Sequence, residues 1–339
     1  MHPLKLVGGY GSPYSRKMRA VLRYRRIDFR WIMRGSSADV GIPPVPVALI
    51  PVLVFPGTPD TAMIDSTFQI KRLETLFAQR SLVPTDPALA FLHELLEDYG
   101  DEWLTKPMFH YRWKYDADTH KASHVLALDR DLHLSDARLE KASGFFAERQ
   151  IARLGVVGSN NITTPVIEDS YRRLLHLLDD HLKAGNYFLM GSRPGAGDFG
   201  IFGQLSQLAH LDPTPAAIAA QQAPRVVSWV SHMDDLSALE TDQWTSRDKL
   251  APTLRAFFVE IGRVYAPFLI ANARAIASRS AQVEGEIDGR PWVQQPFPYQ
   301  AKCLKWLREG HAALAAADRE FVDSYLAGTG ADAIFSTKI

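Results

Sequence analysis

The hydrophobic positions nearest the N-terminus predict a strand, a tight turn and a helix. Residues 4–7 form a short apolar run that favours a strand. The apolar residues that follow recur at helical spacing: Met18, Val21 and Leu22. Gly11 allows a tight turn, and Pro13 suits the first turn of a helix because its missing N–H would be unpaired there. The pattern therefore puts Ser12 at the amino end of a helix.

Further apolar runs predict three more strands. They cover residues 27–33, 50–55 and 62–64, and the Pro56-Gly57 turn signal between the last two favours an antiparallel hairpin. If the first two strands are parallel, the helix between them is a crossover and the unit is βαβ. Residues 65–67 offer capping side chains for a second helix. We therefore expect an α/β layer of order βαβ-ββα with a mixed four-stranded sheet.

Residues 89–103 combine one apolar stripe with many carboxylates, which is typical of an amphipathic helix. The acidic side chains are expected on the side opposite the stripe: Glu94, Glu97, Asp98, Asp101 and Glu102. With His110 nearby they could hold a metal ion. A solvated acidic face is the usual partner of an apolar stripe, so we expect no metal site.

The rest of the chain is predicted to be helical apart from one hairpin. The helical segments are residues 118–150, expected to form a helix pair, and residues 165–183, 249–278 and 301–325. Asp288-Gly289 is a favoured two-residue turn and predicts a β-hairpin over residues 283–293. The expected organisation is an N-terminal domain at 1–80, a linker at 81–88, a helical domain at 89–240 and an extension at 241–339.

Charge and cysteine content restrict the partners. The 339 residues carry 38 Lys and Arg against 38 Asp and Glu, which argues against nucleic acid or an anionic membrane as a partner. The one cysteine, Cys303, can form no internal disulfide, and its place in a helical pattern favours a buried, inert thiol. The chain shows no signal-peptide pattern and no apolar run approaching ~20 residues, so we expect a cytoplasmic protein without a membrane segment.

Ser12 is the first candidate for chemistry. Backbone N–H groups and the helix dipole favour a negative charge at the amino end of a helix. A serine hydroxyl there is a poor base, but it donates a hydrogen bond well to an anion. If that anion is a thiolate, the thiol pKa falls from about 8.5 toward neutrality. The alternative is that Ser12 is a simple helix cap, as serine often is.

Three segments of the N-terminal part together resemble the thioredoxin-like domain of the glutathione S-transferases. Ser12-Pro13-Tyr14-Ser15 stands where glutaredoxin-like relatives have Cys-Pro-Tyr-Cys. Ile50-Pro51-Val52-Leu53 resembles the Val-Pro-Val-Leu segment of the family with its cis-proline, and Asp65-Ser66 resembles its Glu-Ser pair. Each segment alone is a weak signal, whereas the three in this order and spacing are fairly specific.

The resemblance implies a glutathione site. Ile50, before a cis bond to Pro51, would offer its backbone N–H and C=O to the cysteinyl part of glutathione. Asp65 would meet the γ-glutamyl ammonium, and Ser66 with the helix N–H groups would meet the carboxylate. Asp65 is one methylene shorter than the Glu of the family, which affects how tightly glutathione would be held. A plain helix cap is the alternative for this pair.

Ser15 is the second candidate for the hydroxyl that faces the thiol, ranked below Ser12 because it lies further into the helix. With serine at both positions, disulfide exchange of the glutaredoxin kind is excluded, because the protein offers no sulfur there.

A second stretch extends the resemblance into the helical part. Residues 188–199 resemble the family segment Phe-Leu-x-Gly … Ser/Thr-x-x-Asp-Phe, in which Asp198 would reach back to the cap N–H of its helix; Gly195 here replaces the usual Ser or Thr. By analogy, His110, Tyr111 and Trp113 would line the electrophile side of the cleft. Ordinary aromatic packing is the alternative for these three.

The first hypothesis is therefore a glutathione transferase with a role in detoxification. Ser12 would stabilise the glutathione thiolate, which would attack a small electrophile, and no metal is needed. The resemblance also implies a homodimer. Two alternatives stay open: a non-catalytic binding or regulatory protein with this fold, and a glutathione-dependent isomerase or dehalogenase.

Overall fold

The computed structural model of the protein describes residues 3–339. Its first part alternates strands and helices: β1 (Leu4–Gly8), α1 (Pro13–Tyr24), β2 (Phe29–Met33), β3 (Val52–Phe55), β4 (Thr61–Met63) and α2 (Ser66–Leu76). A helical part follows: α3 (Pro87–Asp98), the π-helical turn η1 (Tyr99–Trp103), α4 (Thr105–Lys114), α5 (Asp116–Leu128), α6 (Asp136–Ile151), α7 (Thr164–Lys183), α8 (Ala196–Leu208), α9 (Pro213–Gln222) and α10 (Pro224–Met233).

The last part is a C-terminal extension. It contains the 3₁₀ turn η2 (Arg247–Lys249), α11 (Leu254–Glu260), the π-helical turn η3 (Ile261–Tyr265), α12 (Ala266–Ala277), β5 (Val283–Ile287), β6 (Arg290–Gln294), α13 (Pro298–Ala313), α14 (Ala316–Leu326) and α15 (Ala333–Ser336). The predicted β-hairpin is confirmed, with Asp288 and Gly289 at positive φ angles of 54° and 68° in its turn.

The N-terminal sheet has the predicted mixed topology. Its strand order is β2-β1-β3-β4, with β1 parallel to β2 and antiparallel to β3. Leu6 at the centre of β1 pairs with Trp31 on one side and Leu53 on the other. Because β1 and β2 are parallel, α1 crosses over between them, as the pattern of apolar runs predicts.

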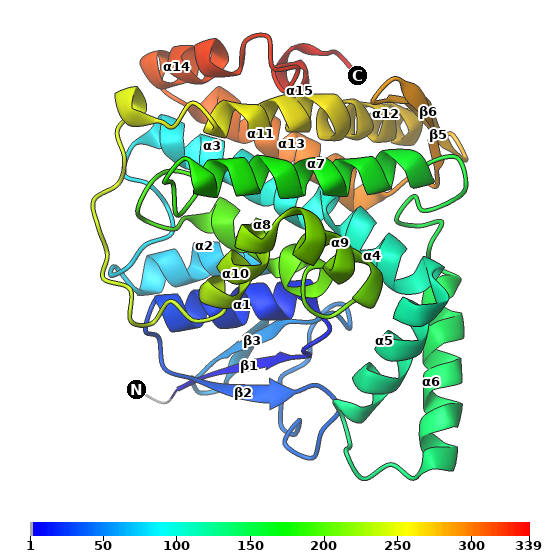
Figure 1. The fold of residues 1–339 in the computed structure, drawn as a ribbon. Coiled ribbons are helices and arrows are strands. Elements are labelled where there is room, and N and C mark those ends of the chain that lie inside the picture. The colour runs from blue at the N-terminus through cyan, green and yellow to red at the C-terminus, as the bar shows by residue number, and fades with distance from the viewer. Residues whose placement is uncertain (1–2) are drawn as a thin grey trace.

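The helices are stacked on one face of this sheet. In Figure 1, α1 and α2 lie directly on the sheet, α8 and α10 lie above α1, and α7, α11 and α12 form the upper layers. One continuous hydrophobic core joins all parts of the chain, with Leu6, Phe199 and Phe258 among its buried members. The extension is therefore packed into the same core as the N-terminal part.

Two predicted helices of the extension differ from the structure. The helix predicted over residues 301–325 is two helices, because Leu314 and Ala315 have extended ψ angles of 142° and 153°. The helix predicted over 249–278 begins at Leu254 and is interrupted by the π-helical turn η3. There, Gly262 lies so close to the chain that a Cβ on it would be 2.1 Å from the carbonyl oxygen of Thr329. No local sequence signal indicates the break at residues 314–315 or the close approach at Gly262.

The prediction of a solvated acidic face on residues 89–103 is wrong. Glu97, Asp101 and Glu102 are buried, with 4%, 5% and 9% of their surface exposed. The apolar stripe of α3 packs in the core, and the opposite side is covered by Lys17 of α1 and by the extension. Amphipathic spacing identifies an apolar face, but it does not show which other segment covers the polar one.

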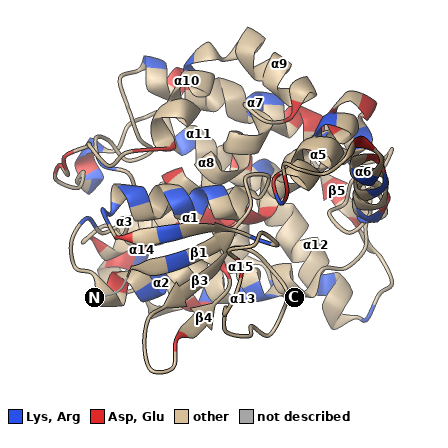
Figure 2. Ribbon diagram, turned by 90° about the horizontal axis from the view of Figure 1, so that it is seen from below, with Lys and Arg blue, Asp and Glu red and all other residues tan. Residues whose placement is uncertain are grey.

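Charges are spread over the chain, with Lys and Arg next to Asp and Glu on most elements (Figure 2). Across residues 3–339, no helix is long and apolar enough to cross a membrane. Within the same residues, no group of three or more His, Cys, Asp and Glu side chains could hold a metal ion. Cys303 is 2% exposed, and burial raises the pKa of its thiol, in agreement with the expected inert cysteine.

Candidate functional site

Ser12 caps the amino end of α1. Its backbone is extended, with φ −99° and ψ 118°, and its Oγ accepts a hydrogen bond from the N–H of Ser15 at 3.2 Å. The Ser12 side chain is partly exposed. The cap accounts for the Oγ as an acceptor only, so the hydroxyl proton is free to be donated to a group outside the helix.

The helical part holds the turn that carries Ser12. Arg112 donates to the carbonyl oxygen of Gly11 at 2.6 Å, and Gln207 donates to that of Tyr10 at 3.1 Å. Arg112 is itself held by an ion pair with Asp212 at 2.9 Å. Leu126 of α5 packs so closely on Gly11 that a Cβ there would be 2.2 Å from its Cδ2. The position of the turn therefore depends on α4, α5 and α8, and a larger residue at position 11 would require the Leu126 side chain to move.

Ser15 lies in a different environment. Its side chain is fully buried and faces β1, where a Cβ on Gly8 would be 2.6 Å from the Ser15 Oγ. The Oγ has no hydrogen-bond partner among the described residues. Of the two serines, Ser12 is thus the one that is partly exposed.

The segment before β3 lies beside this turn. The Ile50–Pro51 peptide bond is cis, as the resemblance implies. The Ile50 Cδ1 is 3.6 Å from the position of a Cβ on Gly9, so Ile50 reaches the residues that precede Ser12. Gln69 of α2 donates to the carbonyl oxygen of Pro51 at 2.9 Å and is fully buried. This bond ties the proline segment to the helix that begins at Ser66.

Asp65 caps α2 from an unusual backbone conformation. Its φ is 75° and its ψ 109°, and its Oδ1 accepts a hydrogen bond from the N–H of Thr67 at 3.1 Å. Its Oδ2 accepts a second hydrogen bond from the hydroxyl of Tyr299 at 2.6 Å. A positive φ is uncommon for a non-glycine residue, and strained residues of this kind cluster at functional sites.

Ser66 takes part in a buried ionic network. Its Oγ lies 3.3 Å from the Nζ of Lys17 and donates to the Oδ2 of Asp101 at 3.4 Å. Lys17 also forms ion pairs of 2.6 Å with Glu97 and with Asp101. Burial alone would lower the pKa of Lys17, but the two carboxylates outweigh it and raise that pKa. Lys17 is therefore a charged side chain that joins α1, α2, α3 and η1 next to the candidate site.

Three carboxyl groups of α3 and η1 have raised pKa values: those of Asp98, Asp101 and Glu102. Burial raises the pKa of Asp101 to about 6, against the opposing effect of Lys17. Burial, and then the charges of Asp98 and Asp101, raise the pKa of Glu102 to about 8. The pKa of Asp98 rises to about 7, mainly through burial, although the hydroxyl of Tyr265 donates to it at 2.5 Å.

This burial predicts a pH-dependent effect of Glu102→Gln. The folded protein keeps Glu102 protonated up to a pKa of about 8, whereas its ordinary value is 4.5, so the wild-type carboxyl destabilises the fold increasingly between these values. The glutamine variant cannot ionise. At about pH 9 we expect the free energy of unfolding of the variant to be on the order of 2 kcal/mol higher than that of the wild type. Near about pH 4 we expect little difference between the two. Urea unfolding of both proteins at several pH values measures this. A difference that does not change with pH would contradict it.

The three predicted electrophile-side residues lie inside the protein. His110, Tyr111 and Trp113 are 0%, 1% and 3% exposed. His110 contacts the Ser159 Oγ at 2.8 Å and the Glu168 Oε1 at 3.3 Å, and burial lowers its pKa to about 4. The ring of Tyr111 is stacked on another tyrosine, and that of Trp113 lies edge-on to a phenylalanine. These contacts favour the packing alternative, and substrate contact by the three stays a prediction.

Asp198 has the predicted capping role. It accepts hydrogen bonds from the N–H groups of Gly195 at 2.9 Å and Leu189 at 2.8 Å. Burial raises its pKa to about 7, although both N–H groups lower it. The contact is structural and lies at the start of α8, the helix that packs on α1.

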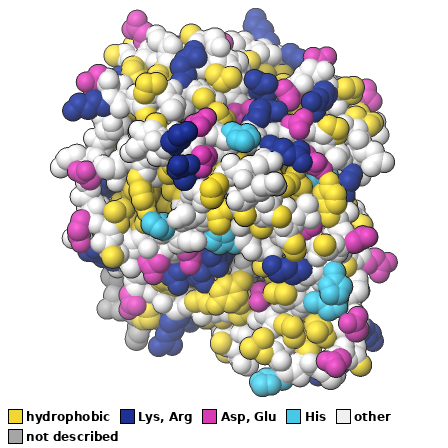
Figure 3. Space-filling view, in the orientation of Figure 1, with side chains coloured by type: hydrophobic (Ala, Val, Ile, Leu, Met, Phe, Trp, Pro, Cys, Tyr) yellow, Lys and Arg dark blue, Asp and Glu magenta, His cyan; other side chains and the backbone are white. Residues whose placement is uncertain are grey.

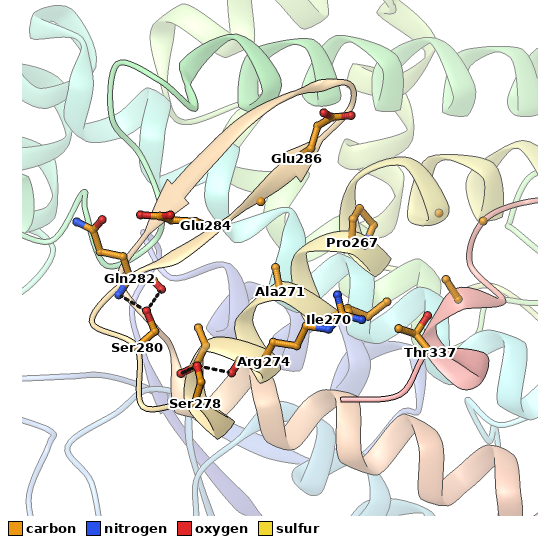
Figure 4. A pocket seen from close by; sticks show the side chains of 15 residues that line it. Pro267, Ile270, Ala271, Arg274, Ser278, Ser280, Gln282, Glu284, Glu286 and Thr337 are labelled. Atoms are coloured by element: carbon orange, nitrogen blue, oxygen red, sulfur yellow. Dashed lines mark hydrogen bonds between the residues drawn. The ribbon is translucent and has the colours of Figure 1, made fainter.

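Other surface features lie apart from these residues. A groove of about 760 Å³ runs between α12, the β5–β6 hairpin and the C-terminus, with Arg274, Glu284 and Glu286 around it (Figure 4). It shares no residue with the candidate site. Figure 3 shows hydrophobic side chains on the lobe formed by α5 and α6, where Leu132 and Phe145 are 80% and 70% exposed.

Sequence reasoning did not identify Lys17 or Tyr299 as site residues. A signal for Lys17 does exist, because it lies four residues before the buried Val21 and so faces the covered side of α1. For Tyr299 we find no signal in the sequence, since its partner Asp65 is 234 residues away.

A mixed sheet of order β2-β1-β3-β4, a crossover helix and a cis-proline before β3 define a thioredoxin-like domain. Residues 6–81 match the protein family described as glutathione S-transferase, N-terminal domain. Over these residues the chain has an N-terminal domain of the glutathione S-transferase family, as the sequence motifs predict.

Similar folds occur among solved structures, at low identity. A GST-like protein from Pseudomonas syringae is 17% identical, with a TM-score of 0.44 over 69% of this chain and 67% of that one. A glutathione transferase family member from Pseudomonas fluorescens, solved with two glutathione bound, is 16% identical, with a TM-score of 0.40 over 67% and 86%. FzlA from C. crescentus is 17% identical, with a TM-score of 0.41 over 74% and 96%. Likenesses of this size carry no argument about function. No curated protein matches the chain.

Proposed function

We propose that the protein is a glutathione transferase, in which Ser12 stabilises the thiolate of glutathione for attack on a small electrophile. The observation that carries the proposal is the convergence of three segments in a domain of this superfamily: the capped start of α1, the cis Ile50–Pro51 segment and the start of α2. The contact of Ile50 with Gly9 and the hydrogen bond from Gln69 to Pro51 bring them together.

The polar groups of these segments suit glutathione. Among the described residues, the N–H and C=O of Ile50 form no backbone hydrogen bond, so both can pair with the cysteinyl backbone of the ligand. The carboxylate of Asp65 can accept from the γ-glutamyl ammonium, because it has lone pairs beyond the two already used. The amino end of α2 and the charge of Lys17 favour the carboxylate of the same ligand end.

The proposed reaction consists of one proton loss and one displacement. The glutathione thiol gives its proton to water, and the sulfur anion accepts a hydrogen bond from the Ser12 hydroxyl at the positive end of α1. The anion then attacks an electrophilic carbon; a C–S bond forms, and the bond to the leaving group breaks with its electron pair. Catalysis consists of a lowered thiol pKa and of positioning.

Binding to immobilised glutathione, followed by a thiol-consumption assay with a generic aryl halide, tests the proposal. We expect retention on the resin, elution by free glutathione, and thiol consumption that saturates with glutathione. A protein that is not retained and consumes no thiol would disprove it. Retention without thiol consumption would favour the non-catalytic alternative.

One observation supports that non-catalytic alternative. Ser66 is 5% exposed and its hydroxyl contacts Lys17 and Asp101, so a ligand carboxylate would have to share or displace these contacts. The homodimer implied by the resemblance stays a prediction. Light scattering on the purified protein would measure its mass against the 37.9 kDa of one chain.

A further inference from the structure

The C-terminal extension reaches the start of α2. Tyr299, the second residue of α13, donates its hydroxyl to the Oδ2 of Asp65 at 2.6 Å. Burial, and then the hydrogen bond to Asp65, raise the pKa of Tyr299 far above its ordinary value. The hydroxyl therefore keeps its proton at neutral pH and remains a donor to the carboxylate.

The residues on both sides of Tyr299 are anchored to other elements. The backbone of Phe297 exchanges two hydrogen bonds with the side chain of Asn272, at 2.8 and 2.9 Å. Gln300, which is buried, donates to the carbonyl oxygen of Glu102 at 3.0 Å. The chain on both sides of Tyr299 is thus held by α12 and by η1. The position of Tyr299 therefore does not depend on its hydrogen bond to Asp65 alone.

Aromatic rings pack around the same contact. The ring of Trp306 lies edge-on to Phe68 at 5.2 Å and to Tyr299 at 5.9 Å. Phe68 belongs to α2, three residues after Asp65, so this packing joins α13 to the first turn of the helix that Asp65 caps. A hydroxyl placed this way is preorganised and loses little conformational entropy when it donates.

The two carboxylate oxygens of Asp65 thus have different partners. Oδ1 accepts from the N–H of Thr67, and Oδ2 accepts from Tyr299. Together these bonds fix the plane of the carboxylate, while an ionised carboxylate has about four lone-pair sites in all. The remaining sites are directed away from the two donors and are left for a cationic group of a ligand.

We propose that Tyr299 is a positioning residue of the glutathione site, which it serves by orienting the Asp65 carboxylate toward the γ-glutamyl ammonium. This inference rests on the proposed function. It makes the extension a part of the binding site: residues from α2 and α13 together form the pocket wall that receives the amino end of the tripeptide. The chemical step at the sulfur does not involve Tyr299.

Tyr299→Phe tests the proposal, since it keeps the ring and removes only the hydroxyl. Glutathione affinity is measured by calorimetry, and KM and kcat by thiol consumption. We expect the Kd and KM for glutathione to rise about tenfold, as for loss of a hydrogen bond to a charged group, with kcat nearly unchanged. Tyr325→Phe is the matched control, because the hydroxyl of Tyr325 in α14 has no hydrogen-bond partner within residues 3–339.

A double-mutant cycle shows whether the effect passes through Asp65. In an Asp65→Asn background, Tyr299→Phe should change the Kd for glutathione by less than about twofold. An unchanged or lower Kd in Tyr299→Phe alone would overturn the proposal, and so would an equal effect in both backgrounds. If the wild type itself does not bind glutathione, the proposed function is wrong and the inference falls with it; this is seen before any variant is compared.

Discussion

Replacing Ser12 with alanine is expected to lower kcat with glutathione by about 10- to 100-fold, with a smaller change in KM. The estimate corresponds to one hydrogen bond to a charged group, roughly 1.5–3 kcal/mol. The pKa of bound glutathione should rise toward its value in water, which can be followed by the ultraviolet absorbance of the thiolate. Steady-state thiol consumption measures kcat.

The helix cap and the hydroxyl donor at position 12 can be separated. Ser12 also caps α1, and alanine at a cap costs about 0.5–2 kcal/mol of stability, whereas glycine costs only a few tenths. Ser12→Gly should therefore lose as much activity as Ser12→Ala while unfolding at nearly the wild-type temperature. Activity kept in the glycine variant would show that Ser12 is a cap only. Loss of activity in Ser15→Ala, with Ser12→Ala active, would move the role to Ser15.

Replacing Lys17 with methionine is expected to destabilise the protein by about 3–5 kcal/mol, the range for breaking a buried ion pair from one side. Methionine has a similar length, so the packing of α1 is largely kept. The cause is that the buried negative charges of Glu97 and Asp101 lose the positive charge that neutralises them. Both carboxylates lie 2.6 Å from the Lys17 Nζ. Urea unfolding followed by circular dichroism measures the free energy.

Lys71→Met is the matched control for Lys17. Lys71 forms an ion pair of 2.7 Å with Glu94, but the two side chains are 55% and 32% exposed. Pairs of this kind contribute about 0–1 kcal/mol. Adding Asp101→Asn to Lys17→Met should recover part of the lost stability, because it removes one of the two uncompensated charges. Equal losses in Lys17→Met and Lys71→Met would contradict the assignment of a buried network.

Most of the N-terminal layer could be predicted from local patterns. The strand, turn and helix around Gly11 and Pro13 and the hairpin before Asp65 are confirmed, because apolar periodicity and turn residues act over short distances. The cis bond at Ile50–Pro51 was implied only by the family resemblance, since nothing local in the sequence distinguishes it from a trans bond.

The polar side of α3 shows where local patterns fail. Its carboxylates were assigned to solvent because an amphipathic helix usually exposes them. Lys17 from α1 and the extension cover that side, and charges can be buried when they are paired and hydrogen-bonded. The pairing partner lies 80 residues from Glu97 and 84 from Asp101, beyond the reach of any periodicity.

By itself, the sequence determined the order of strands and helices in the N-terminal layer, the place of Ser12 at a helix start, and the family of the N-terminal domain. The tertiary structure alone decided which serine is exposed, that Lys17 is paired inside the protein, and that Tyr299 contacts Asp65. The physical reason is that periodicity records which side of each element is apolar. The pairing of polar groups depends instead on which distant segments meet, and that is settled when the whole core packs.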